Sequence, residues 1–117
     1  MTKSEIIARF DALHPNAVPQ DQKASWLDQD NEKVRREIIA MHENPASEGT
    51  DANVLYVYEP YSNYYVYSLA AHLYESLGEI QRYSNAAAFA EAELTAFEND
   101  YLKTHRPINE IERFSVI

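Results

Sequence analysis

The stretch "IQRYSNAAAFAEAELTAFENDYLKTH", residues 80–105, contains no glycine or proline and repeats its apolar residues at helical spacing. The steps alternate between three and four, which draws one apolar seam along a single side of a helix over three heptads. The seam consists of Ile80, Tyr83, Ala87, Ala90, Leu94, Phe97 and Tyr101. We therefore expect a long helix at about 79–105 that is ended by Pro107, with small alanines that permit close approach of another helix.

The preceding stretch, residues 60–77, predicts a partner helix for this seam. Its apolar stripe is formed by Val66, Leu69, Ala70, Leu73 and Leu77. Pro60 suits the first turn of a helix because its missing N–H has no partner there. Gly78 is expected to end the helix in the left-handed conformation that glycine adopts at low cost.

Two more helices are predicted in the N-terminal part of the chain, at about 2–13 and 20–42. Thr2 and Glu5 have the spacing of a capping box at the start of the first. In the second, Asp30 and Asn31 interrupt the apolar face at mid-helix. The sequence thus predicts an all-α fold, a small bundle of about four helices.

The remaining segments are not helical in pattern. "VLYVY", residues 54–58, is β-branched and aromatic, so we expect an extended segment that packs across the helices or is completed as an edge strand by a partner. Residues 43–53 are rich in turn formers and predict a mobile polar loop. With 117 residues, the chain is expected to be a single helical domain over 1–117. Its tail closes on four uncharged residues and is expected to dock.

Composition excludes several functions. The chain has no cysteine, which removes disulfides, thiolate catalysis and zinc–cysteine sites. Its net charge of −9 disfavours ordinary nucleic-acid binding, which needs a surplus of Lys and Arg. No apolar run approaches the roughly 20 residues of a membrane helix, and the first residues lack a signal-peptide pattern. We expect synthesis in the cytosol and no membrane partner.

Tyrosine is concentrated in one part of the chain, with six of the nine tyrosines between residues 59 and 83. Four of them, Tyr61, Tyr64, Tyr65 and Tyr67, crowd two turns of the predicted helix, and one helical face cannot bury all four. Tyrosine is enriched at protein interfaces because it offers a large ring and a hydroxyl. The rings could equally cap the end of a small bundle, and both interpretations stay open at this point.

Candidate catalytic chemistry is sparse. His72 and Glu75 stand three residues apart and could present two ligands to a metal, as in a helical-bundle metalloenzyme. A lone pair of this kind is more often an exposed hydrogen-bonded couple. With two glycines, the chain holds no phosphate-binding glycine loop and no nucleophile elbow. We therefore expect no enzyme activity, no metal and no cofactor.

Three stretches resemble the small head–tail connector (neck adaptor) proteins of tailed bacteriophages, especially those of Gram-positive hosts. They are "EIIARFDALHPNAVPQDQKASWL", "VYEPYSNYYVYSLAAHL" and "GEIQRYSNAAAFAEAELTAFENDYLKTHRP", which together cover most of the chain. The chain departs from the common pattern at Asp30 and Glu32, where a leucine and a glycine are usual, and at Arg35, where an aromatic is common. These departures concern the packing of the middle of the second helix.

The resemblance implies a structural virion protein without enzyme activity. Such a protein forms a ring under the portal at the head–tail junction, contacts other neck components and lets DNA pass without sequence-specific binding. The expected contacts between subunits, or with the portal, are made by Tyr56, Tyr58, Tyr61, Tyr64, Tyr65, Phe114, Val116 and Ile117. The alternative from the acidic composition is a small inhibitor that mimics DNA and binds a host DNA-handling protein.

Overall fold

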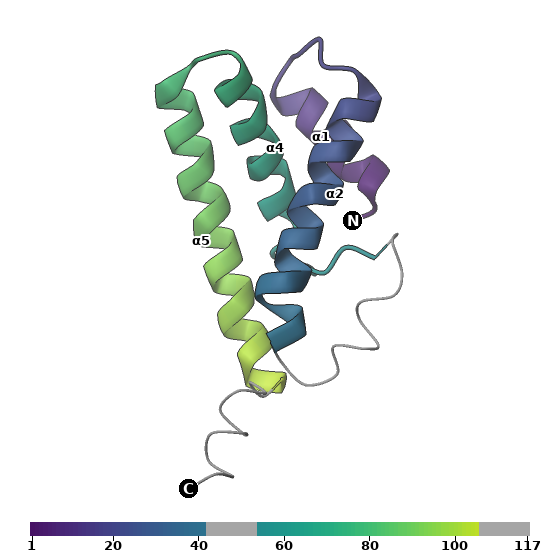
Figure 1. Cartoon of the computed structure of the whole chain (residues 1–117), viewed down its shortest axis with the longest axis vertical. Coiled ribbons are helices and arrows are strands. Elements are labelled where there is room, and N and C mark those ends of the chain that lie inside the picture. Colours follow the sequence, from purple (N-terminus) through teal and green to yellow (C-terminus); the bar gives the residue numbers. More distant parts are fainter. Residues whose placement is uncertain (42–53, 106–117) are drawn as a thin grey trace, which may run out of the picture.

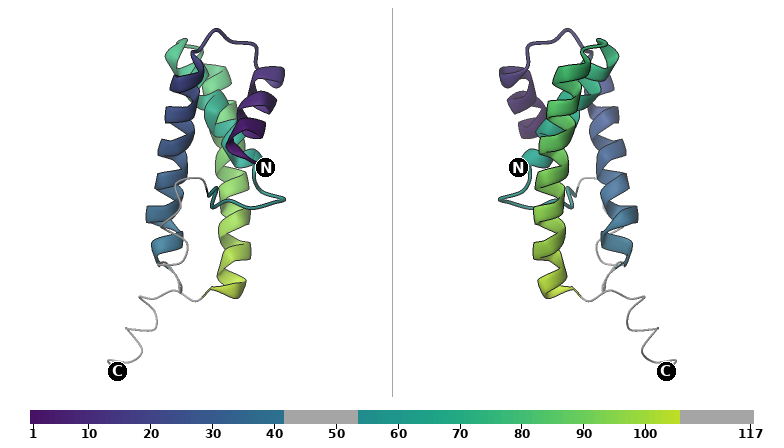
Figure 2. Two further views of the ribbon diagram at one scale, coloured as in Figure 1. Left: turned by 90° about the vertical axis from the view of Figure 1, so that its right-hand side faces the viewer. Right: turned by 90° about the vertical axis from the view of Figure 1, so that its left-hand side faces the viewer.

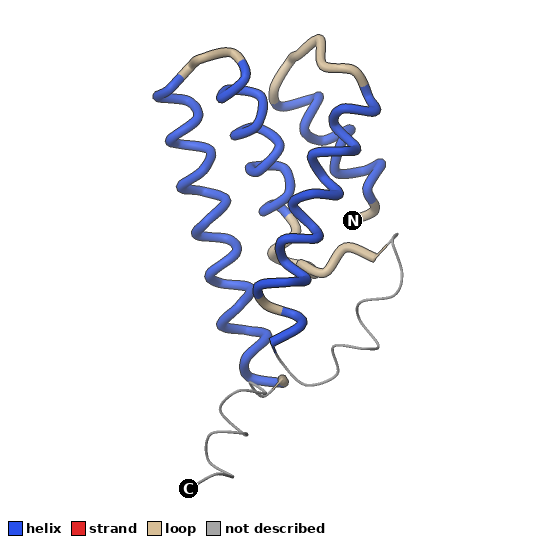
Figure 3. Tube along the Cα trace, in the orientation of Figure 1, coloured by secondary structure: helices blue, strands red, loops and turns tan. Residues whose placement is uncertain are grey.

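The computed structural model describes residues 1–41 and 54–105, and within these ranges all regular structure is helical (Figure 3). The elements are α1 (Lys3–Leu13), α2 (Gln20–Glu37), the 3-10 turn η1 (Ile39–Met41), α4 (Asn63–Ser76) and α5 (Ile80–Thr104). The prediction of an all-α bundle of about four helices is confirmed. The predicted mobile loop at 43–53 and the docking tail lie outside the described residues.

Helix α4 lies at the centre of the bundle. It forms an antiparallel hairpin with α5, and α1 and α2 pack against it from other sides (Figure 1). The side views in Figure 2 place α1 and α2 on either side of α4. The buried Lys23 of α2 joins α1 through an ion pair of 2.7 Å to Asp11.

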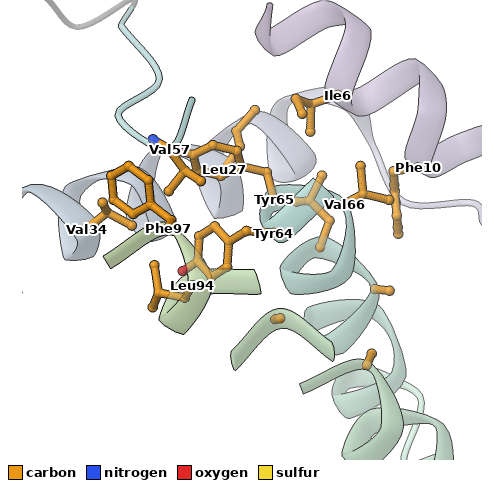
Figure 4. Packing of buried hydrophobic residues seen from close by; sticks show 14 of the residues in the cluster. Ile6, Phe10, Leu27, Val34, Val57, Tyr64, Tyr65, Val66, Leu94 and Phe97 are labelled. Carbon is orange, nitrogen blue, oxygen red and sulfur yellow. The ribbon is translucent and has the colours of Figure 1, made fainter. Parts of the chain in front are cut away.

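One hydrophobic core unites the described elements (Figure 4). Helix α1 contributes Ile6 and Phe10 at its 3.6-residue period, and α5 contributes Phe97 and Tyr101. The rest of the core comes from α2, the turn after it, the segment before α4, α4 and the earlier turns of α5, and consists of Leu27, Val34, Ile38, Ile39, Val57, Tyr64, Tyr65, Val66, Leu69, Ala70, Leu73, Ala86, Ala90 and Leu94.

The predicted seam of α5 is buried from Ala90 to Tyr101 but not at its start. Ile80 is 78% exposed, and Tyr83 and Ala87 are only half-buried. Helix α4 ends at Ser76, so no neighbouring turn remains for Ile80 to pack against. Leu77, predicted as part of the α4 stripe, is exposed at the same end of the hairpin for the same reason.

The helix boundaries differ from the prediction at two places. α2 ends at Glu37 and not at residue 42, and the chain continues as η1. Ile38 and Ile39 at this end are both buried. α4 begins at Asn63, after a turn in which the Ser62 hydroxyl donates to the Glu59 carboxylate at 2.5 Å.

Two predicted caps are confirmed. At the start of α1, Thr2 Oγ1 accepts from the Glu5 N–H and Glu5 Oε1 accepts from the Thr2 N–H, both at 3.1 Å. Gly78 ends α4 with a φ of +72°, the left-handed region that its position between two antiparallel helices requires.

Candidate contact surface

The segment 54–58 carries two of the predicted contact residues and is fixed to the helices by Asn31 of α2. The Asn31 amide nitrogen donates to the Val54 carbonyl at 2.6 Å, and its Oδ1 accepts from the Tyr56 N–H at 3.1 Å. Val57 is buried in the core. The segment forms no strand in the described residues and bends at Tyr56 and Val57, so the predicted extended run is interrupted, although the segment packs against the helices as predicted.

Tyr65 of α4 completes this attachment from the opposite side. Its hydroxyl donates to Asn31 Oδ1 at 2.6 Å and accepts from the Val57 N–H at 2.9 Å. Burial raises the pKa of this hydroxyl far above its ordinary value, so it stays protonated and able to donate. The segment is therefore tied to two helices through two buried side chains.

The outer side of the attached segment presents the pair Tyr58 and Tyr61. Tyr58 is 37% exposed and Tyr61 is half-buried, with ring centroids 6.2 Å apart. Both rings rest on Phe97, Tyr58 edge-on at 4.9 Å and Tyr61 at 6.5 Å. The Tyr58 hydroxyl donates to the Asp100 carboxylate at 2.6 Å. Each ring thus keeps one side for a partner while its other side is held in place.

We call Tyr56, Tyr58 and Tyr61 the aromatic contact surface. Tyr56 is half-buried and sits next to the Asn31 attachment through its own N–H. The three residues come from one short stretch, so a partner can meet them together. Aromatic side chains held rigidly in this way are favourable contact residues, because little conformational entropy is lost on binding.

The burial of Tyr64 and Tyr65 corrects their assignment to a contact surface. Tyr64 is 4% exposed and Tyr65 is fully buried. The two rings pack edge to face at 5.1 Å inside the chain. Both are core residues, and for Tyr65 the buried Asn31 supplies the hydrogen-bond partner that a buried tyrosine hydroxyl needs. The predicted contact residues Phe114, Val116 and Ile117 lie outside the described residues.

Asp30 and Asn31, which the sequence pattern treated as interruptions of the apolar face, hold the elements around the candidate surface together. Both are buried, and Asp30 accepts from the Ser68 hydroxyl at 2.7 Å and pairs with His72 Nε2 at 2.9 Å. The sequence signal that could have revealed them is a polar residue on the predicted apolar face of one helix, together with Tyr, Ser and His side chains on another helix that could bond it. These two residues fasten α2 to α4 with hydrogen bonds in place of apolar contacts.

His72 belongs to this fastening and does not pair with Glu75. Its ring stacks on Trp26 at 5.2 Å and bonds Asp30 across the α2–α4 contact. In the two described ranges no group of three or more His, Cys, Asp or Glu side chains could hold a metal ion. No helix there has both the length and the apolar character to span a membrane.

Comparisons with known proteins give no match. No protein-family model, no curated protein and no solved structure matches the chain.

Proposed function

We propose that the chain is a structural protein of a tailed-phage virion, a head–tail connector that forms a ring under the portal and joins the DNA-filled head to the tail. The observation that supports this proposal most is the aromatic contact surface. Its tyrosines project from a segment tied to α2 and α4, which suits permanent contact with a second protein surface. The resemblance of three stretches to connector proteins is the reason for proposing a head–tail connector rather than another kind of assembly.

A ring subunit needs two different faces, one for each neighbour, or a lateral face and a face for the portal. The aromatic contact surface is one such face in this proposal. The net charge of −9 suits a channel component, because phosphate is repelled and DNA passes without sticking. The proposed place of action is the neck of the virion, after synthesis in the host bacterial cytoplasm.

The acidic inhibitor is the less supported alternative. A DNA mimic needs free carboxylates arranged like phosphates on one exposed face. On the outer side of α2, Asp28 is paired with Lys3 at 2.6 Å and Glu32 with Arg35 at 2.5 Å. Two of the acids that a mimic would use are therefore already neutralised within the chain.

The proposal is tested by locating the chain in virions. Particles purified from an infection that expresses the chain with a small N-terminal tag are labelled with an antibody against the tag and imaged by electron microscopy. We expect label at the head–tail junction of intact virions. Label that is absent from virions, or that lies on the capsid shell or tail fibres, would contradict the proposal.

A further inference from the structure

A cavity of about 250 Å³ lies between α2, α4 and α5. Figure 1 shows α2 and α5 diverging toward the α4–α5 turn, with α4 behind them. None of the three tyrosines of the aromatic contact surface lines this cavity, so it is a separate feature of the molecule.

The walls of the cavity are mainly small and apolar on the α5 side. Ala87, Ala90 and Leu94 line that side, and Ala71 of α4 lines the back. The rings of Tyr64 and Tyr83 also border the space. Alanine side chains leave room for an alkyl chain, and tyrosine faces attract a cation placed over them.

The cavity is lined by two carboxylates that have no partner side chain in the described ranges. Glu75 of α4 and Glu91 of α5 line it and are exposed, and neither carboxylate makes an ion pair or hydrogen bond with another side chain in the described ranges. Asp30 is already bonded to Ser68 and His72. His72 also lines the cavity but is paired with Asp30, so Lys33 of α2 is the cation that opposes the two glutamates. The two free carboxylates outweigh it, so the cavity favours a cationic guest.

The size of the cavity limits the guest to about one side chain. Small-molecule sites usually enclose roughly 300–1,000 Å³, and this space is smaller. A guanidinium can bond two carboxylates at once and stack on a tyrosine ring, and arginine is enriched among residues that dominate protein interfaces. We propose that the cavity takes an arginine side chain of a partner protein. Only the identity of the partner rests on the proposed connector function.

The test uses the isolated chain and a single-residue probe. N-acetylarginine amide carries the guanidinium alone, and N-acetylcitrulline amide keeps its shape without the charge. In a titration followed by amide NMR shifts, we expect saturable shifts at Ala71, Ala87 and Glu91 at millimolar arginine probe and none with the citrulline probe. Shifts that do not saturate, or that are equal for both probes, would overturn the proposal.

Three variants sharpen this result, all at exposed positions so that the fold is kept. Glu75→Gln with Glu91→Gln should weaken arginine binding by about fivefold or more, because two ion pairs are lost. The matched pair Glu37→Gln with Glu98→Gln changes the net charge equally outside the cavity and should alter binding by less than about twofold. Lys33→Ala removes the opposing charge and should tighten binding by about twofold.

Equal weakening by both double variants would mean that the probe senses only net charge, and the proposal would fail. The outcome is independent of the phage assay. If the chain binds the arginine probe but is absent from virions, the arginine site stands and the connector function is rejected. If the chain is found at the head–tail junction but does not bind the probe, the connector function stands and the arginine site is rejected.

Discussion

Asn31 and Tyr65 are bonded to each other inside the core, with the Tyr65 hydroxyl donating to Asn31 Oδ1 at 2.6 Å. The pair joins α2 to α4 and at the same time satisfies three backbone groups of the segment 54–58. Because both side chains are buried, their bonds do not compete with water. The orientation of the aromatic contact surface therefore depends on a residue that is itself hidden from any partner.

Removal of the Tyr65 hydroxyl tests this link. In Tyr65→Phe the Val57 N–H and Asn31 Oδ1 each lose a buried partner, so the free energy of unfolding should fall by about 1–3 kcal/mol in urea titrations. Tyr67→Phe is the matched control on the same helix and is half-buried. It should change the free energy by less than about 0.5 kcal/mol. Equal effects in the two variants would show that the hydroxyl of Tyr65 does not carry the attachment.

The seam of α5 should differ in energy along its length. Phe97 is fully buried, so Phe97→Ala should cost about 3–5 kcal/mol of unfolding free energy. Ile80 stands in the same sequence register but is 78% exposed, so Ile80→Ala should cost less than about 0.5 kcal/mol. Chemical denaturation of both variants measures the difference. A large loss of unfolding free energy for Ile80→Ala would contradict its exposed position at the end of the hairpin.

Gly78 should tolerate substitution only at a backbone cost. A Cβ there would meet nothing within 4 Å, so the cost of Gly78→Ala comes from the φ of +72° alone, about 1–2 kcal/mol. Gly78→Asn should cost less, because asparagine enters the left-handed region more easily. Thermal unfolding compares the stabilities of the two variants. An alanine variant as stable as the parent chain would rule out the left-handed cap.

The contact between His72 and Asp30 should make stability depend on pH. The hydrogen bond that His72 donates to the Asp30 carboxylate raises the pKa of His72 above its ordinary value, although burial opposes the shift. Protonation of His72 therefore stabilises the fold, fully so below its unfolded pKa of about 6.5, and this contribution is lost as pH rises through the higher folded pKa. His72→Gln should thus lower the unfolding free energy more at about pH 5.5 than at about pH 8.5.

His14 acts in the opposite direction and must be separated from this effect. Burial lowers the pKa of His14, so its contribution is lost as pH falls. Comparing His72→Gln with the parent chain at each pH cancels the His14 contribution, because both proteins contain it. A His72→Gln penalty that is the same at both pH values, or larger at high pH, would contradict the charged pair.

The helices were predictable because their signals are local. The α5 seam, the Thr2 and Glu5 capping box and the Gly78 cap each depend on residues a few positions apart. The ends of the α4–α5 hairpin were not predictable in the same way. Whether Ile80 is buried depends on where α4 ends, which is a tertiary fact that the α5 period does not contain.

The candidate surface was only partly predictable. The crowding of tyrosines correctly indicated that one helical face could not bury them all, but it did not say which would be inside. Tyr65 is inside because its partner Asn31 lies opposite it in space, 34 positions away in the chain, and Tyr64 packs beside it in the core. Tyr58 and Tyr61 remain outside because the attached segment turns them toward solvent over Phe97.

The most direct test of the connector account is the fraction of DNA-filled heads that carry a tail. A phage that lacks this gene is complemented with Tyr58→Ser plus Tyr61→Ser, or with Phe89→Ser, a more exposed aromatic of α5 outside the aromatic contact surface. Interface tyrosines often contribute roughly 2 kcal/mol or more each, so the tyrosine variant should lower the tailed fraction by about tenfold or more. The Phe89→Ser chain should complement normally. A tyrosine variant that keeps the helical circular-dichroism signal and still gives a normal tailed fraction would contradict the account.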